Sequence, residues 1–143
     1  YDLYVSYTWP VTQRDLDSGT LFLGGRVGFA CGGSPYMTFS GDDTTAGGQE
    51  VATVKLFQSW DTGNWADSVI ITAAAGWYIP AGGSGPALLT VALQHKTTGE
   101  FRSVYQKVIA PGAQNGAATT PVGTVTVLTH GDPTDPSVRI TFA

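Results

Sequence analysis

The chain has 143 residues, of which only 13% are charged, and its formal net charge at pH 7 is −4. Its seven basic residues are scattered singly, so it lacks the basic patch that binding to nucleic acid or to an anionic membrane requires. Glycine, threonine, valine and tyrosine recur while strong helix formers are scarce, which is typical of an all-β domain. We expect a single domain over residues 1–143, because this length can bury one core and the composition is steady.

The first expected strand covers residues 3–9. Its apolar face carries Leu3, Val5, Tyr7 and Trp9. Alternation with period two indicates a strand with one buried face. Pro10 cannot donate a hydrogen bond to a sheet and should end the strand.

An acidic pair, Asp15 and Asp17, follows on either side of Leu16. In extended backbone the two carboxylates share one face of the strand and Leu16 points the other way. Two such carboxylates repel each other unless water, a hydrogen-bond donor or a cation lies between them. The pair therefore indicates either a solvated strand edge that discourages pairing or a site for a hard cation.

The rest of the chain alternates short apolar runs with segments rich in turn residues. Further strands are expected at residues 26–31, 36–40, 50–57, 69–71, 76–80, 87–95, 101–109, 122–129 and 138–142. Residues 69–71 lack alternation, as expected of a central strand covered on both faces. Turns are predicted at Gly24-Gly25 and at residues 97–100, and residues 110–121 are expected to be the least ordered. About nine to eleven strands at this spacing predict an antiparallel β-sandwich or jelly roll.

Catalytic motifs are missing from the sequence. Cys31 is the one cysteine, so no internal disulfide forms, and it is expected to pack as a small buried residue. His95 and His130 lack the ligand spacing of a zinc site. No nucleophile motif or phosphate loop occurs. We therefore predict that the protein is not an enzyme.

Several segments resemble the TW…DLD signature of bacterial secreted or periplasmic β-sandwich modules, of the YfaP-like and pre-peptidase C-terminal-like kind. The matching segments are Thr8-Trp9, Asp15-Leu16-Asp17 and residues 40–51, with residues 76–78 as a late aromatic strand. The resemblance implies that the DLD strand and the acidic loop lie near one end of the sandwich. The chain departs from the family pattern at Ser18-Gly19, where a turn is expected instead of a continued strand.

The acidic residues of these segments predict a calcium site, since calcium takes six to eight oxygen ligands. If the two segments meet, the candidate ligands are Asp15, Asp17, Asp42, Asp43 and Glu50. The alternative is a solvated acidic loop that binds no ion.

The main functional expectation is a structural module that assembles with copies of itself, in an extracellular filament, a surface layer or a virion. Low charge, abundant small residues and the lack of an active-site motif favour it. We expect a location outside the cell or at its surface, and no membrane insertion, because no apolar run is long enough to span a bilayer.

The first strand is the expected contact between copies. A terminal strand often lies at a sheet edge, where unpaired backbone groups can recruit another chain. Assembly would then use Leu3, Val5, Tyr7 and Trp9, with Pro10 as the hinge of a head-to-tail contact. The alternative is that this segment is an ordinary first strand of its own sandwich.

A carbohydrate-binding module is the alternative function. Trp60 and Trp65 flank a short segment that contains Asp61 and Asn64. Exposed rings with polar neighbours would form a platform for a glycan. Against this, large aromatic residues more commonly anchor a core.

Overall fold

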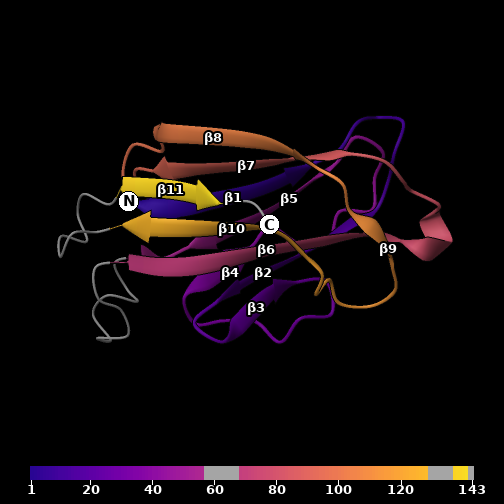
Figure 1. Cartoon of the computed structure of the whole chain (residues 1–143), viewed down its shortest axis with the longest axis horizontal. Coiled ribbons are helices and arrows are strands. Elements are labelled where there is room, and N and C mark those ends of the chain that lie inside the picture. The colour runs from indigo at the N-terminus through magenta and orange to yellow at the C-terminus, as the bar shows by residue number, and fades with distance from the viewer. Residues whose placement is uncertain (57–67, 129–136, 142–143) are drawn as a thin grey trace.

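The computed structural model describes residues 1–56, 68–128 and 137–141 (Figure 1). The strands are β1 (Asp2–Thr8), β2 (Leu16–Phe22), β3 (Gly25–Gly28), β4 (Met37–Phe39), β5 (Gln49–Val54), β6 (Ser68–Tyr78), β7 (Ala87–Gln94), β8 (Phe101–Ile109), β9 (Gly112–Gln114), β10 (Pro121–Leu128) and β11 (Ser137–Thr141). A short 3-10 helix, η1 (Ile79–Ala81), follows β6. No helix among these residues has the length and apolar character needed to cross a membrane.

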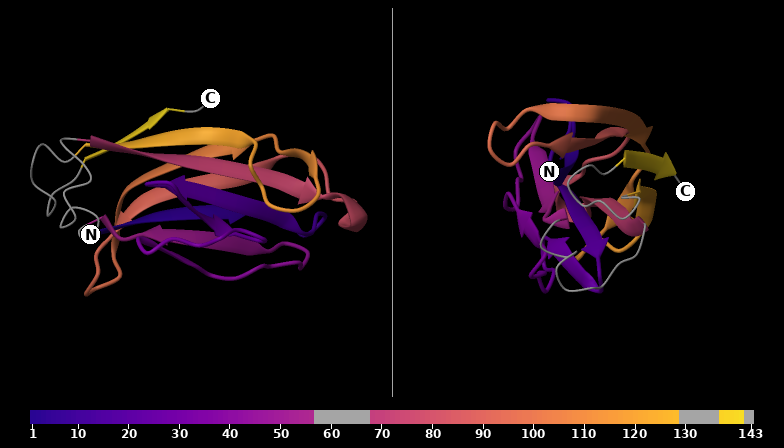
Figure 2. Two further views of the ribbon diagram at one scale, coloured as in Figure 1. Left: turned by 90° about the horizontal axis from the view of Figure 1, so that it is seen from below. Right: turned by 90° about the vertical axis from the view of Figure 1, so that its left-hand side faces the viewer.

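Two sheets pack face to face as a β-sandwich, which confirms the predicted fold class. One sheet has the order β4-β5-β1-β7-β8 and the other β11-β10-β6-β2-β3. Neighbouring strands in both sheets are antiparallel, and β9 adds to β6 in parallel. The right-hand view of Figure 2 looks along the strands and shows the sheets as two facing layers.

One hydrophobic core fills the space between the sheets. Its fully buried members include Leu3, Val5, Val54, Ile71, Leu89, Val91, Leu93, Val125 and Val127. Tyr7 also points into it, and its hydroxyl lies 2.8 Å from Thr20 Oγ1 of the opposite sheet. The burial of that hydroxyl raises the pKa of Tyr7. The residues of the apolar faces predicted from alternation in the sequence therefore lie in this core, and they come from both sheets.

Strand β1 lies in the middle of its sheet, so the expectation that it occupies an edge is wrong. It pairs with β5 on one side and with β7 on the other. The four residues expected to contact a neighbouring copy are all in the core, with exposed fractions between 0% and 5%: Leu3, Val5, Tyr7 and Trp9. The structure thus has β1 as an ordinary strand of its own sandwich, and contact through these residues would require β1 to leave that sheet.

Strand β6 joins two segments that the sequence separated. It runs for 11 residues and contains the predicted run at 69–71 and the start of the one at 76–80, whose last two residues, Ile79 and Pro80, lie in η1. Its central position between β10 and β2 agrees with expectation. However, Ile70 is 60% exposed, so this part of the strand is covered on one face only.

Both turns predicted from the sequence connect neighbouring antiparallel strands. The turn at Gly24 is confirmed, since Leu23 and Gly24 both have positive φ, 48° and 77°, between the paired residues Phe22 and Gly25. This pair of positive φ angles is characteristic of a tight hairpin turn. The loop predicted at residues 97–100 joins β7 to β8.

Other local expectations are wrong. Strand β2 continues through Ser18-Gly19 without a turn. Strand β3 ends at Gly28, and Cys31 lies beyond it and is half-buried rather than buried. The stretch 110–121 contains β9 and the fully buried Ala118, so it is more ordered than its composition indicates.

Candidate metal centre

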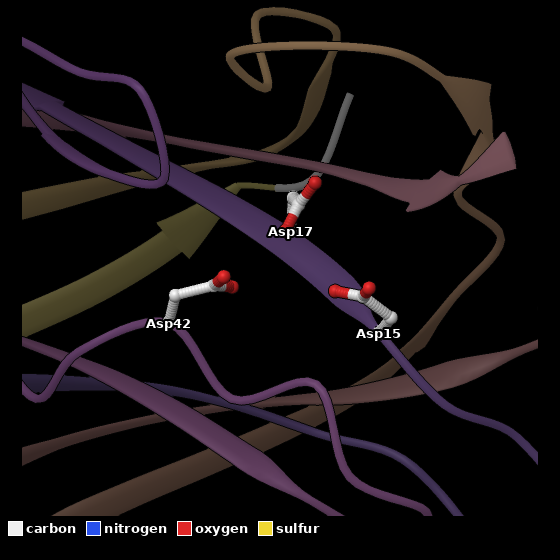
Figure 3. Close-up of side chains that lie close together, drawn as sticks. All are labelled: Asp15, Asp17 and Asp42. Carbon is white, nitrogen blue, oxygen red and sulfur yellow. The ribbon is translucent and has the colours of Figure 1, made fainter. Parts of the chain in front are cut away.

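The candidate site lies where β3 stops covering β2. Gly28, the last residue of β3, pairs with Gly19, and residues 16–18 of β2 pair with β6 alone. The loop at residues 40–48, which connects β4 to β5, approaches this free edge (Figure 3). The two segments that the resemblance placed at one end of the sandwich therefore do meet.

Three of the five predicted ligands come together at this edge. Asp15 and Asp17 project from the start of β2, and Asp42 projects from the loop (Figure 3). One carboxylate oxygen of each lies within 4.8 Å of the others. Leu16, between the two aspartates, is fully buried in the core, as expected, but Asp15 precedes β2 with a φ of 62°, so the extended backbone assumed for the pair is not present at Asp15. Such a group can hold a metal ion, and its all-oxygen donors suit a hard cation.

Backbone contacts hold the two segments in place. The buried indole of Trp9 donates from Nε1 to the carbonyl of Thr45 at 2.9 Å, and the Gly47 N–H donates to the Pro10 carbonyl at 3.2 Å. On the other side, the Tyr78 N–H donates to the Asp15 carbonyl at 3.1 Å. These contacts within the chain fix the position of the loop relative to the strand end.

Glu50, a predicted ligand, has a different role. It is fully buried, and its Oε1 accepts hydrogen bonds from the N–H and hydroxyl of Ser18, at 3.0 and 2.7 Å. Its Oε2 accepts from the Asp43 N–H at 3.0 Å. Both oxygens therefore tie the free edge of β2 to the loop. Burial raises the pKa of Glu50 to about 8, although these donors oppose that rise.

Asp43, also a predicted ligand, shapes the loop instead. Its Oδ1 accepts from the N–H and hydroxyl of Thr45, and its Oδ2 accepts from the Gln49 N–H at 3.0 Å. The Thr45 and Gln49 donors lower its pKa. These contacts are local turn contacts of the kind that aspartate commonly makes.

The three clustered carboxylates are electrostatically unfavourable on their own. Burial raises the pKa of Asp17 to about 7, with further contributions from the charges of Asp15 and Asp42, and a hydrogen bond with Gln114 opposes the rise. Burial and the neighbouring Asp42 and Asp43 also raise the pKa of Asp15. Asp17 is only 1% exposed, and its Oδ2 has no hydrogen-bond partner among the described residues. A buried oxygen without a partner is the feature most in need of a cation or a proton.

The carboxylates line a pocket of about 230 Å³. Its other walls are Phe29, Thr44 and Tyr78. The two rings lie with their centroids 6.5 Å apart, tilted by 59°. The sequence analysis did not name these three as site residues: Tyr78 and Thr44 belong to the segments singled out at residues 76–78 and 40–51, whereas no pattern marks Phe29. Phe29 and Tyr78 reach the pocket because the chain beyond β3 and the end of β6 both pass this edge, and Thr44 belongs to the loop at residues 40–48.

The aromatic platform proposed from the sequence lies outside the described residues, since it consists of Trp60, Asp61, Asn64 and Trp65.

Comparison of the chain with protein-family models, with curated proteins and with solved structures finds no match. The likeness to YfaP-like and pre-peptidase C-terminal-like modules therefore stays a prediction from short motifs.

Proposed function

We propose that this protein is a non-catalytic, calcium-binding β-sandwich module. The observation that carries the proposal is the buried, unpartnered Oδ2 of Asp17, set beside the carboxylates of Asp15 and Asp42. Gln114 donates to the Asp17 carboxyl group, but the buried Oδ2 has no donor, and a buried ionised oxygen without a donor is unfavourable. A divalent cation supplies the missing partner and relieves the repulsion among the three side chains.

Calcium suits this donor set better than other common ions. Three carboxylates provide three to six oxygens, depending on how many bind through both atoms, and calcium accepts such irregular sets. Magnesium demands near-octahedral geometry and keeps several waters. Zinc favours histidine and cysteine, and neither is in the group. A site with few protein ligands fits the weak affinities of extracellular calcium modules, which supports the expected location outside the cell.

A thermal melt tests this proposal. Calcium at about 100 times its Kd adds about 2.7 kcal/mol to the free energy of unfolding, which should raise Tm by roughly 5–10 °C over a sample in chelator. Asp17→Asn should abolish the rise. The control is Glu100→Gln, an exposed carboxylate in the β7–β8 loop, which should keep it. Equal melting temperatures with calcium and with chelator would overturn the proposal.

A self-assembling structural role is the second candidate, and the outer face of the first sheet favours it. Strand β8, at the edge of that sheet, exposes Phe101 by 50%, Val104 by 54% and Val108 by 65%. Apolar hollows of about 130 and 320 Å³ lie on this face beside Phe101 and beside Val108. Clustered apolar side chains of this kind usually mark a contact surface.

A second copy of the chain is the occupant we propose for this face. The charged residues of β8, Arg102 and Lys107, pair with the core residues Leu93 and Leu89, so they lie on the other side of the strand and leave the exposed apolar face of β8 uncharged. The strand bulges near Ser103, where φ is 53°, and such a bulge opposes continuous edge-to-edge pairing. We therefore place the contact on the side-chain face of the sheet rather than on the β8 backbone.

Substitution on that face tests the assembly proposal. Val108→Lys should lower the assembled fraction in light scattering and negative-stain microscopy, because it places a charge in the contact. The matched control is Ile70→Lys on the other sheet, since Ile70 is exposed by 60%. A wild-type protein that stays monomeric at high concentration, or a Val108→Lys variant that assembles normally, would count against the proposal.

A further inference from the structure

The pocket next to the three carboxylates has two unlike walls, and this contrast indicates what it binds. Its polar lining is the group of Asp15, Asp17 and Asp42, together with Thr44. The rest of the lining consists of two aromatic side chains. Phe29 is 37% exposed and Tyr78 is half-buried. A small number of polar groups facing an apolar surface is the usual composition of a ligand site.

A calcium ion at the carboxylates would keep coordination positions for a ligand. Its six to eight positions exceed what three carboxylates fill when at least some of them bind through one oxygen. The remaining positions face the pocket, because Asp15, Asp17 and Asp42 all line it. A ligand in the pocket can therefore bind the ion directly.

Charge decides which oxygen atoms can fill those positions. Three ionised carboxylates and one Ca²⁺ ion sum to a net charge of −1, and the nearby Asp43 carboxylate adds to the negative field. A ligand carboxylate or phosphate would meet this negative charge, whereas neutral hydroxyl groups would not. Two adjacent hydroxyls on one small ring satisfy two coordination positions at once.

The aromatic wall and the size of the pocket narrow the ligand further. Rings of Phe and Tyr present apolar faces that pack against the C–H face of a sugar ring. The volume of about 230 Å³ is below the range of about 300–1,000 Å³ that encloses drug-sized ligands. One terminal sugar unit fits such a space better than a chain of several.

We propose that the calcium-loaded pocket binds a single neutral sugar residue, through two neighbouring hydroxyls on the ion and through packing on Phe29 and Tyr78. This inference rests on the proposed calcium site and names the ligand class of that site. It differs from the tryptophan platform predicted from the sequence, because it uses different residues and depends on calcium.

The test is binding of the wild-type protein to immobilised D-mannose, D-galactose, D-glucose and L-fucose, with calcium and with chelator. We expect binding to at least one of them in calcium, weakened by at least about tenfold in chelator and in Phe29→Ala. The control is Ile70→Ala, which removes an exposed apolar side chain, 60% against 37%, away from both the pocket and the proposed assembly face, and should leave binding unchanged. Saturation-transfer NMR with the free sugar should show the same pattern.

The outcomes separate this inference from the proposed function. No binding to any of the four sugars in calcium, or binding that persists in chelator or in Phe29→Ala, overturns the inference. A preference for a sugar that carries a carboxylate, tested with D-glucuronic acid, also overturns it. If the calcium-dependent rise in Tm remains in any of these cases, the calcium site stands without the sugar. If that rise is missing, both fail together.

Discussion

Asp17 shows how burial turns an ordinary carboxylate into a group that needs a partner. It is almost fully covered, and burial together with its acidic neighbours raises its pKa to about 7. Glu50, which ties β2 to the loop, has a pKa of about 8 for the same main reason. Near neutral pH both residues must bind a proton or a cation, or else destabilise the fold.

This coupling predicts an inverted pH dependence in the absence of calcium. The folded chain holds protons on Asp17 and Glu50 at pH values where the unfolded chain, with carboxyl pKa values near 4, has lost them. Protonation therefore stabilises the fold, and this stabilisation is lost as the pH rises from about 4 to about 8. In chelator, the free energy of unfolding should fall by up to about 1.4 kcal/mol per pH unit for each group.

Urea denaturation at pH 5, 6, 7 and 8 measures this dependence. Asp17→Asn should make the fall smaller and should stabilise the chelated protein at pH 8, because it removes one of the two groups. Saturating calcium should also reduce the fall, since the ion replaces the protons. Stability that rises steadily from pH 5 to pH 8 in chelator would contradict this account.

At the scale of elements, the end of β3 creates the site. Gly28 has a φ of 141°, and a Cβ atom built there would lie 1.9 Å from the carbonyl oxygen of Ser18. Only glycine permits this close approach of the two backbones. Because β3 ends here, the edge of β2 at Asp17 is left to the loop that carries Asp42.

We expect Gly28→Ala to separate β3 from β2 and to disturb the site. The free energy of unfolding in urea should fall by more than about 2 kcal/mol, since backbone atoms must move to admit the methyl group. The rise of Tm in calcium should also shrink. Gly32→Ala is the control, because a Cβ atom at Gly32 meets nothing within 4 Å, and it should change stability by no more than about 0.5 kcal/mol. Equal stability of the two variants would show that this approach is not essential.

Strands and turns could be predicted from the sequence where they depend only on residues close to one another in the chain. Alternation in residues 3–9 marks a core strand, and the glycine at position 24 marks a turn, both as observed. Alternation does not say which strands become neighbours, so the central position of β1 was missed. The continuation of β2 through Ser18-Gly19 was missed for a similar reason, since Glu50, distant in sequence, binds the Ser18 N–H and hydroxyl.

The candidate site was predictable in part for related reasons. The sequence marked Asp15, Asp17 and Asp42 as candidate ligands on the condition that their two segments meet, and the structure brings these three together. Asp43 and Glu50 instead accept hydrogen bonds from the chain, and these contacts depend on a loop geometry that the spacing of residues in the sequence does not predict. The aromatic wall, Phe29 and Tyr78, comes from two separate segments that meet only in the folded chain.

At the scale of the whole molecule, the site joins the two sheets. Asp15 and Asp17 belong to the sheet of β2, and Asp42 lies in the loop that connects β4 to β5 of the other sheet. An ion bound by all three carboxylates would link the two sheets on the side where β3 and β4 are the edge strands. The chain has only seven basic residues to pair with its carboxylates, and exposed ion pairs contribute little to stability. A bound ion that links the two sheets would therefore add to the stability of this fold.

Isothermal titration with calcium tests the central claim most directly. At pH 7.5 the account predicts one Ca²⁺ ion per chain, release of protons that grows as the pH is lowered toward 6, and loss of binding in Asp17→Asn but not in Glu100→Gln. No binding at millimolar calcium, or binding of equal strength in Asp17→Asn, would contradict it.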